Sequence, residues 1–214
     1  MSTVELTTTD RLHIRQASER LGREFEGRLN TETIERFMED SVERLSGKAD
    51  HSMWIPLLAE RFTRDRLRAF VRLDSPEMTT NPSILFLCVH NAGRSQMAAG
   101  FARALGGDHV DVYSGGSEPA EHINAAAVEA MAELDIDIRE QIPQPWSDEI
   151  VRAADVVVTM GCGDACPVFP GKRYLDWELD DPAGRAIDEV RTIRDDIRSR
   201  VATLLRELEV DIRL

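Results

Sequence analysis

The apolar positions of the chain change their spacing near residue 80. Before that point they recur every three or four residues along three segments, which is the spacing of helices that bury one face. We expect helices from Asp10 to Gly27, from a cap at Asn30 or Thr31 to a stop at Gly47, and from Pro56 to Val71. Arg and Glu are dense on the other faces, so this segment is predicted to form a small three-helix bundle.

After residue 80, short apolar runs alternate with helical patterns, which is typical of a parallel sheet with crossover helices. The predicted strands are 83–88, 110–114, 155–160 and 172–177. The predicted helices are 94–105, 125–134, 148–153 and 188–208. The second part of the chain is therefore predicted to be an α/β unit.

A polar stretch with two prolines, from Asp74 to Ser83, separates the two patterns and is typical of a linker. We expect residues 1–78 to form the helical bundle and residues 79–214 the α/β domain. The bundle fits a packing or solubility appendage as well as it fits an interaction role, and self-association through its helices is one hypothesis.

Composition narrows the class of protein. Hydrophobic residues make up 42% of the 214 residues, and no apolar run is long enough to span a bilayer. The first residues lack the basic and apolar regions of a signal peptide. The three cysteines, an odd number, favour reduced thiols over disulfide staples. These two features predict a cytoplasmic protein. The net charge of -13 argues against binding to nucleic acid or to anionic membranes.

The charge is unevenly divided. Residues 1–80 carry 13 basic and 15 acidic side chains, a net of -2, whereas residues 81–214 carry 13 and 24, a net of -11. An anionic substrate of the second unit must therefore be held by local donors against an unfavourable long-range field.

Cys88 ends the first apolar run of the α/β unit, and five residues separate it from Arg94, which opens a helix. Backbone N–H groups of such a loop can turn inward around an anion, and the helix N-terminus adds positive potential. The Arg94 guanidinium can bind two anion oxygens, and the same field favours a nucleophilic thiolate. A buried structural cysteine is the alternative. The predicted oxyanion loop consists of Val89, His90, Asn91, Ala92, Gly93, Arg94 and Ser95.

A second candidate group is the acidic pair before Pro182. A carboxylic acid beside a thiolate–anion adduct can protonate the departing oxygen, and Pro182 fixes the backbone that aims the preceding carboxylate. Asp181 is the better candidate and Asp180 the alternative. An ordinary Asp-Pro turn is the competing interpretation.

Cys162 and Cys166 follow a predicted strand at its carboxyl end, where open α/β sheets bind ligands. A zinc site is disfavoured because the spacing lacks a second ligand pair. Two buried small residues are the structural alternative, and a redox role near Cys88 is the favoured hypothesis.

Together these segments resemble the thioredoxin-coupled arsenate reductases, which have the low-molecular-weight tyrosine phosphatase fold. The resemblance covers about residues 81–214. It implies a four-stranded parallel sheet with flanking helices and the reduction of arsenate to arsenite without a cofactor. The helical bundle resembles an extension of some members. The resemblance is carried by Leu87–Gly100, Tyr113–Gly116, Val157–Cys162 and Asp181–Gly184.

The resemblance also implies roles for single residues. Cys88 would attack arsenate, Arg94 and Ser95 would support the oxyanion and the thiolate, and Asp181 would protonate the leaving oxygen. Cys162 would then attack Cys88 and release arsenite. Cys166 would take over the disulfide, which thioredoxin would reduce. Phosphate or sulfate would fit the same loop.

Two features depart from the family pattern. The three residues between Cys162 and Cys166 are fewer than usual, which puts the geometry of the disulfide relay in doubt. Some relatives hold potassium through a glutamate in the helix after the loop, where this chain has Ala99. We therefore predict no metal site.

Three other functions remain open from the sequence. A phosphotyrosine phosphatase uses the same loop and acid. In such enzymes aromatic side chains just after the Asp-Pro often line the slot that binds the aryl group, whereas this chain has Ala183 and Gly184 there. A non-catalytic oxyanion sensor could signal through the helical bundle. An arsenate reductase with a small thiol donor would leave Cys166 idle.

Overall fold

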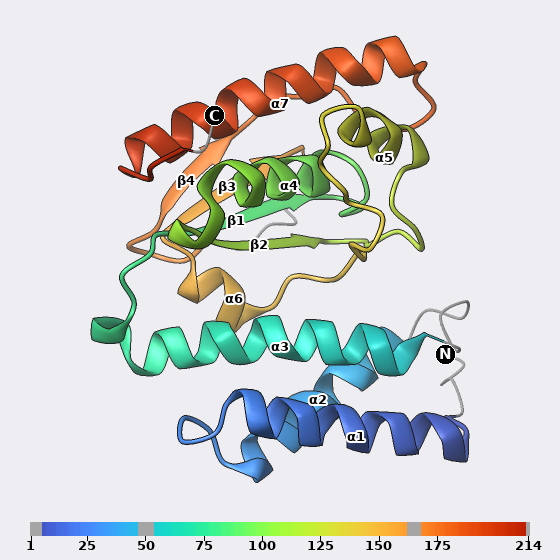
Figure 1. The fold of residues 1–214 in the computed structure, drawn as a ribbon, viewed down its shortest axis with the longest axis vertical. Coiled ribbons are helices and arrows are strands. Elements are labelled where there is room, and N and C mark those ends of the chain that lie inside the picture. The colour runs from blue at the N-terminus through green and yellow to red at the C-terminus, as the bar shows by residue number, and fades with distance from the viewer. Residues whose placement is uncertain (1–5, 47–53, 162–167, 213–214) are drawn as a thin grey trace. The chain divides into compact units, whose positions relative to one another are not determined.

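The computed structural model describes residues 6–46, 54–161 and 168–212, and the chain divides into two compact units, residues 1–78 and 79–214. The first unit contains α1 (Thr8–Glu24), α2 (Thr31–Ser46) and α3 (Ile55–Asp74), followed by a 3-10 turn at Pro76–Met78. Helix α3 packs against both other helices (Figure 1). The three predicted helices are confirmed, with shifted ends.

The shift at the start of α1 has a local cause. The Thr7 hydroxyl accepts a hydrogen bond from the backbone N–H of Asp10 at 3.1 Å, and the Asp10 carboxylate accepts one from the N–H of Thr7 at 2.9 Å. This reciprocal cap satisfies two N–H groups at the helix end. Helix α1 therefore begins at Thr8 instead of Asp10.

A buried arginine joins α2 to α3. Arg66 forms an ion pair with Asp40 at 2.6 Å and donates to Ser41 Oγ at 2.9 Å. Its guanidinium also lies over the rings of Phe37 and Phe62, at 4.9 and 5.2 Å from their centroids. A charge is stable in an interior when it is paired in this way, so Arg66 fixes the register of the two helices.

The second unit is built on one sheet. Its strands are β1 (Ser83–Cys88), β2 (Asp111–Gly116), β3 (Val156–Met160) and β4 (Arg173–Asp176), all parallel and in the order β2-β1-β3-β4. Every residue of β1 is buried, as expected for a strand covered on both faces. The predicted four-stranded parallel sheet is confirmed.

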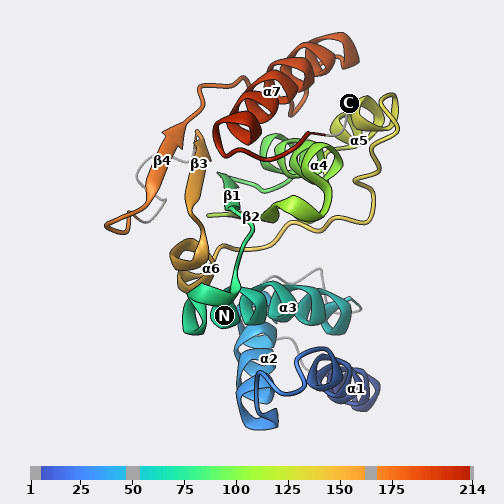
Figure 2. The same ribbon diagram turned by 60° about the vertical axis from the view of Figure 1, so that its left-hand side comes forward.

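Helices cover the sheet on both sides. Helix α4 (Arg94–Gly106) and α7 (Ile187–Glu207) lie together on one face with α5 (Ala125–Ala132) beside them, and α6 (Asp148–Ala153) lies on the other (Figures 1 and 2). A 3-10 turn at Gly107–His109 follows α4. None of the helices in the described ranges is long and apolar enough to cross a membrane.

Strand β2 is longer than the prediction that ended it at Ser114. Gly115 and Gly116 continue the ladder opposite Leu87 and Cys88. Glycine weakens a strand in isolation, which is why the sequence pattern stopped early. Here the missing side chain is required, because a Cβ on Gly116 would lie 2.6 Å from the carbonyl oxygen of Val89.

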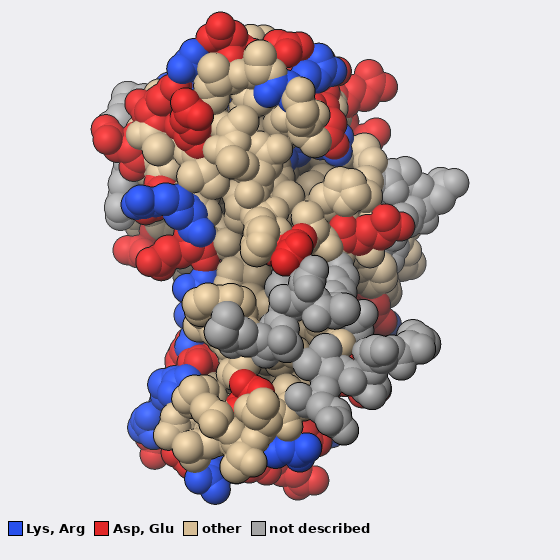
Figure 3. Space-filling model, turned by 90° about the vertical axis from the view of Figure 1, so that its right-hand side faces the viewer, with Lys and Arg blue, Asp and Glu red and all other residues tan. Residues whose placement is uncertain are grey.

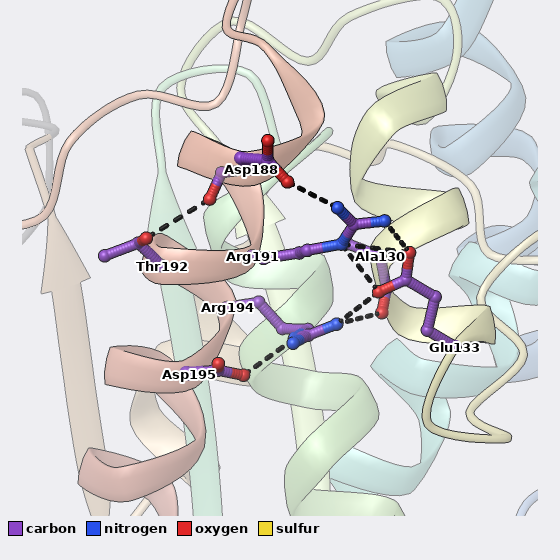
Figure 4. A network of polar contacts seen from close by, with 7 residues as sticks. All are labelled: Ala130, Glu133, Asp188, Arg191, Thr192, Arg194 and Asp195. Atoms are coloured by element: carbon purple, nitrogen blue, oxygen red, sulfur yellow. Dashed lines mark hydrogen bonds and ion pairs between the residues drawn. The ribbon is translucent and has the colours of Figure 1, made fainter.

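Glu133, just after α5, fastens this helix to α7 (Figure 4). Its carboxylate accepts hydrogen bonds from Arg191 at 2.5 Å and from Arg194 at 2.9 Å, and Arg194 also donates to the carbonyl of Ala130 at 2.8 Å. These bonds, that of Arg191 first, lower the pKa of Glu133 from 4.5 to about 2. Acidic and basic side chains are interspersed over the part of the second unit drawn at the top of Figure 3.

We predict that Glu133→Gln lowers the melting temperature at pH 7, whereas the matched change Glu129→Gln on α5 has a smaller effect. Because the folded pKa of Glu133 is depressed, its contribution is full above about pH 4.5 and is lost as the pH falls towards 2. Thermal unfolding followed by circular dichroism across this range should show the difference from wild type shrinking on acidification. A difference that stays constant with pH would contradict this role.

Candidate active site

Cys88 lies at the carboxyl end of the central strand β1. Its register partners are Gly116 of β2 and Met160 of β3. The chain leaves β1 towards β2 on one side and returns to β3 on the other, so Cys88 sits where the strand order reverses. Open α/β sheets bind ligands at this point. The Cys88 side chain is buried, with 2% of the residue exposed.

The loop after Cys88 presents unpaired backbone donors. In the described part of the chain, the N–H groups of His90, Ala92, Gly93 and Arg94 donate no hydrogen bond to another residue. Ala92, Gly93 and Arg94 are buried. Buried N–H groups without an acceptor are rare in proteins. Together with the N-terminus of α4, these groups are able to hold an anion.

Two donors lie close to the Cys88 sulfur. The backbone N–H of Asn91 donates to Cys88 Sγ at 3.1 Å, and Ser95 Oγ lies 3.0 Å from the same sulfur. Asn91 has a left-handed backbone with φ of 46°, and its side-chain nitrogen donates to Ser95 Oγ at 2.9 Å. Asparagine is one of the few residues that adopt this conformation readily. The left-handed turn at Asn91 thus brings two hydrogen-bonding groups to the sulfur.

Arg94 contacts the acidic pair before Pro182, the candidate general acid. Its guanidinium forms an ion pair with Asp181 at 2.6 Å and donates to the carbonyl of Leu179 at 3.4 Å. The other Asp181 oxygen accepts from the N–H of Ala183 at 2.9 Å. Asp180 instead faces Arg185 at 3.7 Å and is largely exposed. The structure therefore brings Asp181, and not Asp180, to the oxyanion loop.

Cys88, Arg94 and Asp181 line one cavity of about 210 Å³. No Phe, Tyr or Trp lines it within the described ranges, and small side chains form much of its wall. The cavity suits a small oxyanion better than an aryl phosphate. Its other lining residues are His90, Ala92, Gly93, Ala120, His122, Asn124, Pro182 and Ala183.

Sequence reasoning missed one wall of this cavity, the segment from Glu118 to Asn124. Three backbone hydrogen bonds tie it to the loop: Glu118 N to Val89 O at 2.9 Å, Ala120 N to His90 O at 2.8 Å, and Asn124 N to Ala92 O at 2.9 Å. Main-chain bonds of this kind leave no signal in the side-chain pattern. The three hydrogen bonds bring His122 and Asn124 to the cavity, although both lie between the predicted strand 110–114 and the predicted helix 125–134.

Cys162 and Cys166 lie outside the described residues. The chain reaches them from Gly161, whose φ is 73° and on which a Cβ would lie 2.9 Å from the Arg94 guanidinium. Gly161 follows Met160, the register partner of Cys88. The residue before Cys162 is therefore placed beside the oxyanion loop.

Ala99, the position that holds a glutamate in potassium-binding relatives, is buried in α4. Over the residues that the structure describes, no group of three His, Cys, Asp or Glu side chains is placed to hold a metal ion. The expectation that the site needs no metal stays a prediction.

This fold and this loop define an oxyanion site of the phosphatase class, and the chain belongs to the low molecular weight phosphotyrosine protein phosphatase family, which matches residues 83–214. Residues 14–71 match the N-terminal domain of protein-tyrosine-phosphatase-like proteins. Within the family, the resemblance to the arsenate reductases is confirmed by the relatives that follow.

An arsenate reductase of Halalkalibacterium halodurans is 44% identical over 130 residues, which cover 56% of this chain and 92% of that protein. A thioredoxin-dependent arsenate reductase of Corynebacterium glutamicum has a similar structure, with a TM-score of 0.79 and 36% identity over 92% of this chain and 96% of that one. An arsenate reductase in a phosphate-binding state has a TM-score of 0.54 and 33% identity over 59% of this chain and 98% of its own.

We predict that Asp181→Asn tightens phosphate binding about two- to fivefold, because a partly exposed ion pair of this kind is worth no more than about 1 kcal/mol. An incoming anion must share Arg94 with the Asp181 carboxylate, and the amide releases the guanidinium. Calorimetric titration with phosphate measures the effect. Asp180→Asn, the matched removal of a neighbouring charge, should change the affinity less. Equal gains in both variants would point to general electrostatics instead of the Arg94 ion pair.

Proposed function

We propose that this protein reduces arsenate to arsenite, with Cys88 as the nucleophile. The observation that carries the proposal is the meeting of a buried thiol, unpaired loop N–H groups, Arg94 and Asp181 in one small cavity. Its relatives named arsenate reductases support the substrate class. The lack of aromatic lining in the described ranges favours a small inorganic anion over a phosphotyrosine.

In the first step, the Cys88 thiolate attacks arsenic while Arg94 and the loop N–H groups hold the other oxygens. A sulfur–arsenic bond forms and one arsenic–oxygen bond breaks. Asp181 supplies the proton with which the departing oxygen leaves as water. To do so Asp181 must be protonated and separate from Arg94 as the anion takes over the guanidinium.

The next steps transfer two electrons to arsenic. The Cys162 thiolate attacks the Cys88 sulfur, a disulfide forms, and the pair of the sulfur–arsenic bond stays on arsenic, which leaves as arsenite. Cys166 then attacks Cys162, which frees the Cys88 thiolate and leaves a Cys162–Cys166 disulfide. The position of Gly161 beside Arg94 supports the approach of Cys162 to the loop.

The proposed reductant of the Cys162–Cys166 disulfide is thioredoxin. Support comes from the Corynebacterium glutamicum protein, which is named thioredoxin-dependent and matches both units of this chain. A small thiol is the alternative donor. Arsenate-dependent NADPH oxidation with thioredoxin and thioredoxin reductase, set beside glutathione with its own reductase and beside an aryl phosphate assay, separates the three functions. Turnover of the aryl phosphate alone would contradict arsenate reduction.

Cys88→Ser should lower arsenate reduction at least about a hundredfold, because an alkoxide is far less available near neutral pH than a thiolate. The same coupled assay measures this loss, and circular dichroism shows whether the variant is folded. Substantial turnover in folded Cys88→Ser would rule out the mechanism.

Replacement of Cys162 or of Cys166 by serine should stop the reaction at different steps. Cys166→Ser should release one equivalent of arsenite and retain a Cys88–Cys162 disulfide, whereas Cys162→Ser should stall with arsenic bound to Cys88. Peptide mapping by mass spectrometry after a single turnover identifies both species. Repeated turnover of Cys166→Ser with thioredoxin would mean that thioredoxin attacks Cys162 directly.

A further inference from the structure

The side chain of Asn91 has only one orientation that fits its neighbours. Its Oδ1 atom accepts a hydrogen bond from the backbone N–H of Gln144 at 2.9 Å. A backbone N–H can only donate, so the oxygen of the amide must face it. The nitrogen of the amide therefore faces Ser95 Oγ, to which it donates at 2.9 Å.

This orientation fixes the direction of the hydrogen bond at the sulfur. Ser95 has a single hydroxyl proton, and one lone pair of its oxygen is occupied by Asn91. The proton is free to point at Cys88 Sγ, 3.0 Å away. The sulfur thus receives a hydrogen bond from Ser95 and one from the N–H of Asn91, and both depend on the conformation of Asn91.

The side chain of Gln96 holds Asn91 in this conformation. Its side-chain nitrogen lies 3.0 Å from Asn91 Oδ1, 3.1 Å from Asn91 O and 3.3 Å from Ile142 O. One amino group thus contacts both the side-chain and the main-chain oxygen of the left-handed residue. Gln96 is 1% exposed, so bulk solvent does not reach it, and its Oε1 has no partner among the described residues.

We infer that Gln96 is a positioning residue that holds Asn91, and through it the two hydrogen-bond donors of the Cys88 sulfur, in the geometry that a thiolate needs. Gln96 acts through Asn91 and Ser95. It is not among the residues that line the cavity, and the recorded side-chain contact to the sulfur is that of Ser95. The titratable groups that share the cavity with Cys88 are His90, Arg94, His122 and Asp181, none of which Gln96 contacts through a hydrogen bond that the structure records. The inference deepens the proposed function, but thiolate formation can be measured without arsenate.

The test uses the full chain with Cys162→Ser and Cys166→Ser, which leaves Cys88 as the sole thiol. The rate of alkylation by iodoacetamide, measured against pH in a buffer free of phosphate and sulfate, gives the pH at which half of Cys88 is thiolate. Gln96→Met should raise this midpoint by about one pH unit, which is about a tenfold loss of thiolate below the midpoint.

Gln144→Met is the matched control. It also removes a buried amide, one that donates to Ser114 O at 3.1 Å, but it keeps the backbone N–H that holds Asn91. Its midpoint should equal that of the parent. Equal shifts in both variants would overturn the inference, because they would show a general effect of packing.

A further measurement separates positioning from a structural role. In a Ser95→Ala background, Gln96→Met should shift the midpoint less than it does with Ser95 present, because one of the two bonds it controls is already gone. Should Gln96→Met fail to fold, Gln96→Asn withdraws the same amide by one methylene group and should shift the midpoint in the same direction. A folded variant of either kind with the midpoint of the parent would overturn the inference.

Discussion

The unpaired N–H groups of the loop after β1 are the constraint on which the catalytic unit depends. An anion would satisfy them, yet the surrounding residues 81–214 carry a net charge of -11. Long-range attraction cannot supply the affinity, so it must come from donors held in place before the anion arrives. The loop is accordingly held in place by hydrogen bonds from a neighbouring segment of the chain. The N–H groups of Glu118, Ala120 and Asn124 hold its carbonyls, and Gly116 allows the end of β2 to approach it.

Arg94 illustrates how the charges of this site are balanced. The Arg94 side chain, 10% exposed, would carry an uncompensated buried charge without a partner, and Asp181 provides one. The same carboxylate is the proposed acid of the reaction. One residue can serve both roles in turn, because an anion that takes over Arg94 leaves Asp181 beside the leaving oxygen. Gly93 permits this close approach of the two segments, because a Cβ at its position would lie 2.5 Å from the Pro182 ring.

The sequence predicted those parts of the structure that are encoded locally. The apolar run of β1, the spacing from Cys88 to Arg94 and the start of α4 lie within a few residues of one another, and all were found. Residues that meet only through the fold were not. The backbone of Gln144 reaches Asn91 from 53 positions away, and His122 enters the cavity through main-chain bonds of its segment. The sequence favoured Asp181 over Asp180, and the structure adds the partners: Asp181 faces Arg94, whereas Asp180 faces Arg185.

Relatives with and without a helical unit share the unit that carries the proposed active site. The Halalkalibacterium halodurans protein is 92% covered by a match of 130 residues, so it has no room for a counterpart of residues 1–78. The Corynebacterium glutamicum protein, in contrast, matches 92% of this chain. All residues proposed to act on arsenic belong to the second unit. The first unit has its own core and its own buried, paired Arg66, so its internal stability does not rest on the active site. The steps proposed for arsenate therefore draw on side chains of the second unit alone.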